Sequence, residues 1–482
     1  MTITWNVQTQ SSYNGKHFLI QTVASDKEIC SNHLSNHVVI YFHKLVSSGI
    51  RHSFIVHDLS TNASKQFYFD AYYTSGMALY PTTITINDMK ITGQGECWFC
   101  GKKTVDMGGT YYPGIGWIPE TDEYGIVGHF NIYSVMSGNG SYELFTIQGT
   151  GGLTRIEPRG SYEQIFMVGY PFNCPLDANG SPTASCLVGL GYNPNTDIWT
   201  YDIVHPTNTN EIFTDVVDAS VGIVVVSRFK DDHYHIGLRH TKNGPISGYL
   251  SLLSNSNIYD MQLANSYTTN NPVAWRNDAD PILLASDDCG MSVTMTHPCD
   301  NIAYGIASFK LSVPNMGDVH IDAAKYIPNT SYLSLLDSKA NCSNPSTCYL
   351  VDDNNQNQYS VYIIDWISSY PFYIYIKANC SKNDYCWQSL VTYDSSTYSF
   401  RYIVGHNPNN SLTYTKYKSL PPSPFSSTCI GTSVYSVQNL TIPTPTTGES
   451  VYSDPVFKGY QTIPMIGNFT SMTVVKNTLC TF

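Results

Sequence analysis

The sequence contains little charge, and what it has is mostly negative. Charged residues make up 13% of the 482 residues, and 37 Asp and Glu against 25 Lys and Arg give a net charge of −12. An average soluble domain carries about a quarter of charged residues. Proteins that grip phosphate backbones need clustered Lys and Arg, whereas these are scattered, so we expect no nucleic-acid partner.

Long apolar runs and helical periodicity are also missing. No run approaches the 18 apolar residues of a membrane-spanning helix, so none is expected. Gly, Pro or Asn interrupts almost every amphipathic pattern, and the best short helix candidate is Asp322 to Lys325. Met1 to Trp5 lacks the basic and apolar regions of a signal peptide. Either the protein is not exported by that route, or the sequence begins after a removed signal.

Aromatic and β-branched residues are abundant instead. The chain has 37 Tyr, 19 Phe and 7 Trp, and its 34 Gly and 25 Pro are spread along its length. Such side chains suit the pleated surface of a sheet, and dispersed Gly and Pro suit turns between many short strands. The composition therefore predicts an all-β protein.

Residues 86–132 form the unit from which the architecture is inferred. Three short β-prone runs, Ile86 to Ile91, Cys97 to Gly101 and Gly125 to Ile132, are separated by glycine-rich turns and predict an antiparallel meander. The unit recurs downstream, where Asp260-Met261 matches Asp88-Met89 and the run from Tyr304 to Leu311 matches that from Tyr124 to Ile132.

This repetition predicts a β-propeller of six or seven antiparallel blades, because a radial arrangement leaves only short sheet edges. Stacked β-sandwich domains are the alternative. We expect residues 1–482 to form a single propeller domain, with residues 1–80 and 421–482 as the candidates that close the ring.

Three aspartates recur at the same position of the unit, Asp88, Asp215 and Asp260. Either they are ligands, or each carboxylate accepts backbone N–H bonds at a tight turn. Every blade must solve the same turn problem, whereas one active site needs no such copies, so the structural role is favoured.

Thirteen cysteines are many for a cytosolic protein of this size, and most fall in near pairs. The pairs favour a disulfide framework in an oxidising compartment. The candidates are Cys174 with Cys186, Cys289 with Cys299, Cys342 with Cys348, Cys380 with Cys386, and Cys429 with Cys480. Cys30, Cys97 and Cys100 leave at least one odd thiol, which we expect to be a buried free cysteine. Cys97 and Cys100 are not expected to share a metal, because residues three apart in a strand point to opposite faces.

The motifs of the unit also carry a resemblance. With its Asp88-Met89 start, its Trp98-Phe99-Cys100-Gly101 strand and its Gly125-Ile126-Val127-Gly128-His129-Phe130-Asn131-Ile132 run, the chain resembles a family of uncharacterised, exported β-propeller-like repeat proteins of anaerobic gut bacteria. The resemblance implies a propeller fold and a place at the cell surface. It implies no reaction.

No residue pattern identifies a catalytic centre, and no motif implies a cofactor or metal. Ser286-Asp287-Asp288-Cys289-Gly290 matches only part of a sialidase Asp-box, and no G-x-S-x-G elbow occurs. We therefore expect a non-catalytic recognition or structural protein, extracytoplasmic, surface-bound or secreted, that binds a glycan or a protein through propeller loops. A glycoside hydrolase or lyase on the same fold, and the head of a viral or phage attachment protein, stay open as alternatives.

Overall fold

The described part of the protein is all-β apart from one short helix. The computed structural model describes its strands, this helix and the shorter connections, with side chains chiefly between residues 37 and 225. The described residues are 2–8, 16–23, 30–34, 37–46, 49–58, 60–61, 63–70, 72–75, 78–113, 116–159, 164–176, 182–193, 198–206, 211–218, 223–229, 233–239, 246–253, 261–265, 282–286, 304–312, 320–329, 333–341, 346–353, 358–365, 373–381, 386–394, 399–406, 411–419, 432–436, 438–439, 456–459, 461–462 and 466–480.

The described strands form seven sheets, which we number along the chain. Sheet 1 has the order β1 (Thr2–Gln8), β35 (Ile466–Cys480), β6 (Ser64–Asp70), β5 (Gly49–Asp58), β4 (His37–Val46), β3 (Cys30–Leu34). Sheet 2 has the order β34 (Gln461–Thr462), β11 (Tyr142–Ile147), β10 (Gly116–Asn131), β9 (Glu96–Tyr112), β8 (Ala78–Ile91), β7 (Tyr72–Ser75). Sheet 3 has the order β12 (Thr150–Arg159), β13 (Gln164–Pro171), β14 (Cys186–Asn193), β15 (Ile198–Val204), β33 (Val456–Gly459).

The other four sheets repeat this plan. Sheet 4 consists of β16 (Glu211–Asp218), β17 (Ile223–Phe229), β18 (His233–Arg239) and β19 (Ile246–Leu253). Sheet 5 consists of β20 (Met261–Asn265), β21 (Ile282–Ser286), β22 (Tyr304–Ser312), β23 (His320–Asn329) and β32 (Gln438–Asn439). Sheet 6 consists of β24 (Leu333–Asn341), β25 (Ser346–Asp353), β26 (Gln358–Asp365), β27 (Tyr373–Ser381) and β31 (Thr432–Ser436). Sheet 7 has the order β2 (Lys16–Val23), β30 (Ser411–Ser419), β29 (Ser399–His406), β28 (Cys386–Asp394).

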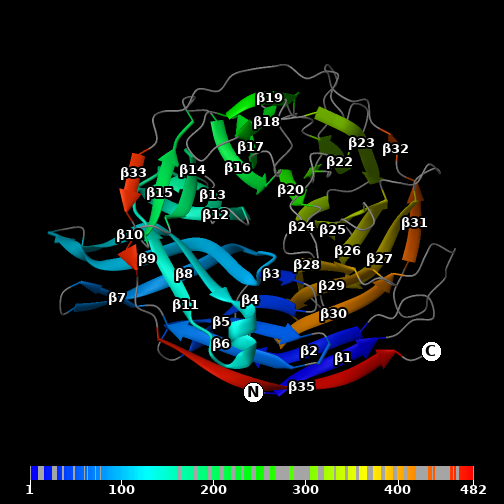
Figure 1. Cartoon of the computed structure of the whole chain (residues 1–482), viewed down its shortest axis with the longest axis horizontal. Coiled ribbons are helices and arrows are strands. Elements are labelled where there is room, and N and C mark those ends of the chain that lie inside the picture. The colour runs from blue at the N-terminus through cyan, green and yellow to red at the C-terminus, as the bar shows by residue number, and fades with distance from the viewer. Residues whose placement is uncertain are drawn as a thin grey trace.

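Within a sheet, strands that follow one another in the chain pair antiparallel, and β1 with β35 is a parallel pair. One strand of each sheet contacts its counterparts in the two neighbouring sheets. These inner strands are β3, β8, β12, β16, β20, β24 and β28, and their contacts run in this order from β3 to β28 and back to β3. Figure 1 shows the sheets following one another around the centre of the view. We call the opposite side of each sheet its outer edge.

The core consists of apolar layers between successive sheets. Side chains alternate along β9, so Cys97 and Phe99 pack toward sheet 1, whereas Trp98 and Cys100 pack toward sheet 3. A third cluster, which includes Phe166 and Phe213, joins sheets 3 and 4. Sheet 2 is therefore buried on both faces.

The meander predicted for residues 86–132 is present as β8, β9 and β10, but its strands are much longer than expected. They contain 14, 17 and 16 residues, and most of the stretch interpreted as a Gly- and Tyr-rich loop is a paired ribbon. Gly108, at φ +90°, lies where the β9–β10 register shifts, so the ladder continues past the glycines through a β-bulge.

The helix prediction was wrong in place. Asp322 to Lys325 lies inside strand β23, because pairing with β22 outweighs a weak local preference for helix. The helix is α1, Ile132–Ser137. Asn131 caps its N-terminus by accepting bonds from the backbone N–H groups of Tyr133 and Ser134, and Gly138 ends it in the left-handed conformation.

The layer between sheets 1 and 2 generates the first prediction. Phe54 is fully buried and its ring lies 5.0 Å from that of Phe99 and 5.1 Å from that of Phe67. Replacing Phe54 by Ala leaves a cavity in this layer, so the free energy of unfolding should fall by about 3–5 kcal/mol, measured by denaturant unfolding. Phe54→Leu, which fills most of the space, should lose much less. Equal losses in the two variants would contradict the packing described.

Candidate functional site

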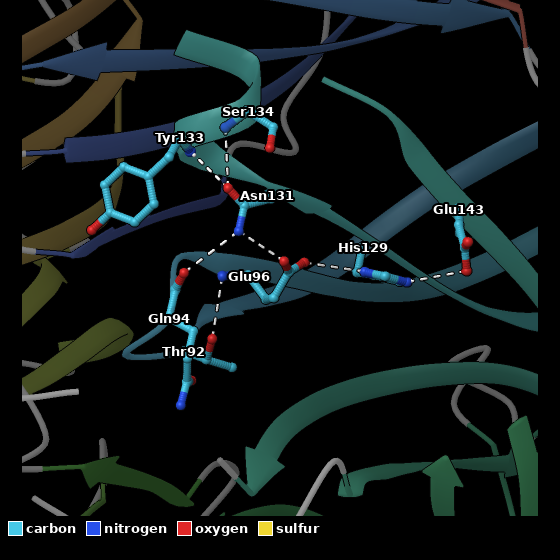
Figure 2. A network of polar contacts seen from close by, with 8 residues as sticks. All are labelled: Thr92, Gln94, Glu96, His129, Asn131, Tyr133, Ser134 and Glu143. Carbon is cyan, nitrogen blue, oxygen red and sulfur yellow. Dashed lines mark hydrogen bonds and ion pairs between the residues drawn. The ribbon is translucent and has the colours of Figure 1, made fainter. Parts of the chain in front are cut away.

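A polar network lies at the end of sheet 2 where α1 begins (Figure 2). The turn before β9 places Glu96, whose backbone N–H donates to the Thr92 hydroxyl. Gly95 adopts φ +86°, and its carbonyl accepts from the backbone N–H of Ile132. The start of β9 is thereby fixed to the start of α1.

His129 of β10 lies between two glutamates. Its Nδ1 is 3.2 Å from Glu96 Oε2 and its Nε2 is 3.3 Å from Glu143 Oε2. Glu143 is directly opposite His129 in the β10–β11 ladder, so register alone brings the two together. Ionised carboxylates only accept hydrogen bonds and a neutral imidazole has one N–H. His129 can therefore bond both glutamates at once only as the imidazolium.

Hydrogen bonding keeps Glu96 in its charged form. Burial acts to raise the pKa of Glu96, but hydrogen bonds from His129 and Asn131 outweigh it and hold the pKa below its usual value. The Asn131 amide donates to Glu96 Oε1 at 2.8 Å while its carbonyl oxygen caps α1. One asparagine therefore connects the helix cap to the acid.

Aromatic rings from two sheets form the wall of this network. The Trp98 ring stacks on His129 with centroids 4.2 Å apart, and Trp199 of β15 meets Trp98 edge-on at 5.3 Å. Tyr192 of β14 lies 5.1 Å from Trp199. We call Glu96, Trp98, His129, Glu143 and Trp199 the Glu-His-Trp patch.

The patch is partly open to solvent. The Glu143 side chain is 55% exposed, those of Glu96 and His129 are 34% and 19% exposed, and Trp199 is half-buried, while Trp98 is buried. The outward groups are two carboxylates and an indole beside them. Carboxylates accept hydrogen bonds from hydroxyl or amine groups, and an indole face offers apolar contact, so the chemistry suits a hydroxylated ligand. Among the described side chains, no group of three or more His, Cys, Asp or Glu could hold a metal ion.

Two of the three recurring aspartates, Asp88 and Asp215, lie at β-bulges rather than in turns. The β8–β9 register shifts between Ile86 and Asp88, and the β16–β17 register shifts between Phe213 and Asp215. Asp88 accepts from the backbone N–H of Met89 and, across the sheet boundary, from that of Ile156 on β12.

This junction and the one between sheets 3 and 4 carry further contacts. Beside Asp88, the Asn87 amide donates to the Leu153 carbonyl at 2.7 Å. Asp215 likewise accepts from the backbone N–H of Val216, and it faces Arg155 of β12 at 4.0 Å. These carboxylates bond backbone groups, as the structural role requires. Asp260 lies outside the described residues.

The four cysteines with described side chains form no disulfide. Cys97 and Cys100 are buried on opposite faces of β9, as predicted. The predicted disulfide between Cys174 and Cys186 is absent, and the Cys174 thiol donates to the carbonyls of Pro175 and Ala184 instead. Burial, followed by the nearby Cys174, raises the pKa of Cys186 well above its usual value. For Cys348, Cys380, Cys386 and Cys480 only the backbone is described. Cys289, Cys299, Cys342 and Cys429 lie outside the described residues. The four disulfides predicted among these eight cysteines therefore stay predictions.

Sequence reasoning missed the Glu-His-Trp patch. The residues come from β9, β10, β11 and β15, and nothing in their spacing along the chain places them together. The one available signal was the alternation in β9, which puts Glu96 and Trp98 on the same face.

No protein-family model and no curated protein matches this chain. Among the described residues, no helix has the length and apolar character needed to cross a membrane.

Asp88 should contribute to stability through its bonds to two sheets. Asp88→Ala removes a charged acceptor from the N–H groups of Met89 and Ile156, so we expect a loss of about 1.5–3 kcal/mol in the free energy of unfolding. Denaturant unfolding measures it. Asp88→Asn, which keeps one acceptor oxygen, should lose less, and a neutral Asp88→Ala would rule out the cross-sheet role.

Glu96 gives a pH-dependent prediction. Because its pKa is lowered in the folded protein, its stabilising effect is complete above the unfolded value of 4.5 and is lost as the pH falls through the folded pKa. The stability difference between the wild type and Glu96→Gln should therefore be constant near neutral pH and shrink below pH 4.5. Thermal unfolding across this range tests it. A difference that grows on acidification would contradict the bonding described.

Proposed function

We propose that residues 1–482 form a single β-propeller whose seven blades are the seven sheets. The proposal is supported by the closed order of contacts among the inner strands, in which β28 returns to β3. It is also supported by sheet 2, which packs apolar layers on both faces. A two-layer sandwich buries one face of each sheet.

In this proposal the two ends of the chain close the ring. β1 pairs with β35 in sheet 1, and β2 pairs with β30 in sheet 7. Residues 1–80 and 421–482 thereby hold adjoining blades together without a covalent link. A place outside the cytoplasm is proposed with it, supported by the paired spacing of the cysteines whose side chains are not described and by the resemblance of the motifs to those of exported repeat proteins.

The proposed function is non-catalytic recognition of a glycan, and the observation that carries it is the Glu-His-Trp patch. Glu143 and Glu96 offer acceptor oxygens beside the half-buried Trp199. Aromatic anchors flanked by fixed polar groups are typical of binding surfaces. The low share of charge in the chain fits a ligand that is read by hydrogen bonds and ring contact.

The electrostatics of Glu96 favour binding over glycoside cleavage. A glycosidase needs one carboxyl group that is protonated near neutral pH, so its pKa must be raised. Hydrogen bonds from His129 and Asn131 lower the pKa of Glu96 despite its burial. Glu96 is thus ionised at neutral pH and suited to accept bonds rather than to deliver a proton.

A glycan array probed with the purified protein tests this function. Trp199→Ala and Glu143→Gln should each weaken binding to any glycan recognised by about tenfold or more, because one removes an aromatic anchor and the other an exposed acceptor. Met107→Ala, at a side chain 44% exposed and outside the patch, is the control and should bind as the wild type.

Mass spectrometry of the incubated glycan separates binding from catalysis. An intact glycan supports recognition, whereas cleavage products would overturn it in favour of a hydrolase or lyase. Absence of binding to every glycan would contradict the proposed ligand class and point to a protein partner.

A further inference from the structure

His129 is the residue of the Glu-His-Trp patch to which the proposed function gives no role. Its ring is fixed by neighbours on the same face of sheet 2, because it stacks on Trp98 at 4.2 Å and on Phe145 at 6.0 Å. Both ring nitrogens point at carboxylates, Nδ1 at Glu96 and Nε2 at Glu143 (Figure 2). The protonation of a ring held in this way decides which of the two carboxylates it bonds.

The two glutamates are not held equally. Glu96 has a second donor, the Asn131 amide, at 2.8 Å from its Oε1. The Glu143 side chain is 55% exposed, and its carboxylate bonds His129 and no other residue in the described part of the chain. The position of Glu143 therefore depends on His129, whereas that of Glu96 does not.

Carboxylates face the imidazole from β9 and β11, and the other elements packed nearby offer aromatic rings or an ion pair of their own. Lys90 of β8 lies opposite Trp98 in the ladder, and its Nζ is 4.0 Å from Glu157 Oε2 of β12. The rings of Tyr192 and Trp199, which come from β14 and β15, are uncharged at neutral pH. Among the described side chains, the charges that contact the imidazole are thus those of the two glutamates.

We propose that His129 is the positioning residue of the patch, and that its imidazolium holds Glu143 in place, so that glycan binding is coupled to a proton on His129. The inference rests on the proposed recognition of a glycan and adds its regulation. In the geometry described, Glu143 Oε2 accepts from Nε2, which leaves Oε1 for a hydroxyl group of the glycan. A glycan that meets a preformed acceptor does not have to order the side chain, so binding is favoured.

Loss of the proton releases Glu143. A neutral imidazole has one N–H, and Glu96, held by Asn131, keeps it at Nδ1. Nε2 then presents a lone pair to Glu143 Oε2 at 3.3 Å, and two acceptors at this distance repel each other. The exposed Glu143 side chain turns into solvent, and a glycan must order it again. Histidine ordinarily changes charge between about pH 5 and 8, where carboxylates stay ionised, so binding is tighter on the acidic side of this range.

NMR of the chain labelled at its histidine nitrogens tests this arrangement without a ligand. The chain has 14 histidines, and the signals missing from His129→Gln are those of His129. They should show both nitrogens protonated at about pH 5.5 and the Nδ1–H form at about pH 8. The Nε2–H form at the higher pH would mean that the proton stays with Glu143, and would overturn the proposal.

The glycan array, probed at about pH 5.5 and about pH 8, tests the coupling. The wild type should bind about tenfold more weakly at the higher pH, as expected for the loss of one charge-assisted hydrogen bond. His129→Gln should bind equally at both pH values, because its amide does not titrate. Glu143→Gln should also lose the pH dependence, since an amide can donate to a neutral Nε2 and accept from an imidazolium. His205→Gln, at a half-buried histidine just past the end of β15, is the matched control and should keep the pH dependence of the wild type.

Glycan recognition and its coupling to His129 fail in different ways. Binding by the wild type that is equal at the two pH values, or a pH dependence that persists in both Gln variants of the patch, would overturn the coupling and leave recognition standing. Absence of binding to every glycan at both pH values would overturn the proposed function and the coupling with it.

Discussion

The arrangement of the sheets depends on how one inner strand is joined to the next. At the β8 bulge, two adjacent side chains form hydrogen bonds to the backbone of β12. Asn87 donates to the Leu153 carbonyl, and Asp88 accepts from the Ile156 N–H. Apolar layers supply most of the free energy of packing, yet they are non-directional. The bulge bonds have a fixed geometry, so they set the position of sheet 2 against sheet 3.

The bulge also explains the glycines of the repeated motif. A Cβ atom on Gly101 would overlap the Thr85 carbonyl oxygen, and one on Gly169 would overlap the Gly152 carbonyl oxygen. Both glycines lie on the strand next to the inner strand of their sheet, opposite the register shift in that inner strand. An extra residue in one strand crowds its partner, so the partner strand requires glycine there. The Asp88-Met89 and Cys100-Gly101 motifs thus belong to the same bulge, one on each of its two strands.

Sequence reasoning succeeded where the cause is local and failed where it is not. The all-β class, the meander of residues 86–132 and the opposite faces of Cys97 and Cys100 follow from composition, turns and the period of two. The ribbon beyond Val105 was missed because its glycines look like turn signals unless the bulge is known. The Glu-His-Trp patch was missed because Trp199 reaches it from another sheet, and the period of a strand says nothing about which sheet comes next.

The terminal segments show how a chain of this length holds its two ends together without needing a bond between them. Thr2 pairs with Thr473, so this contact spans nearly the whole sequence. The entropy lost on closing a loop grows only with the logarithm of its length, about 0.6 kcal/mol for each doubling. Strand β35 is fifteen residues long and pairs with both β1 and β6. Its pairing is therefore large enough to offset the entropy lost when the two ends of the chain are brought together. β31 to β34 are much shorter, and each adds only a few ladder bonds at an outer edge. The strongest of these contacts is thus the pairing of the two chain ends in sheet 1, whereas β31 to β34 each hold an outer edge only weakly.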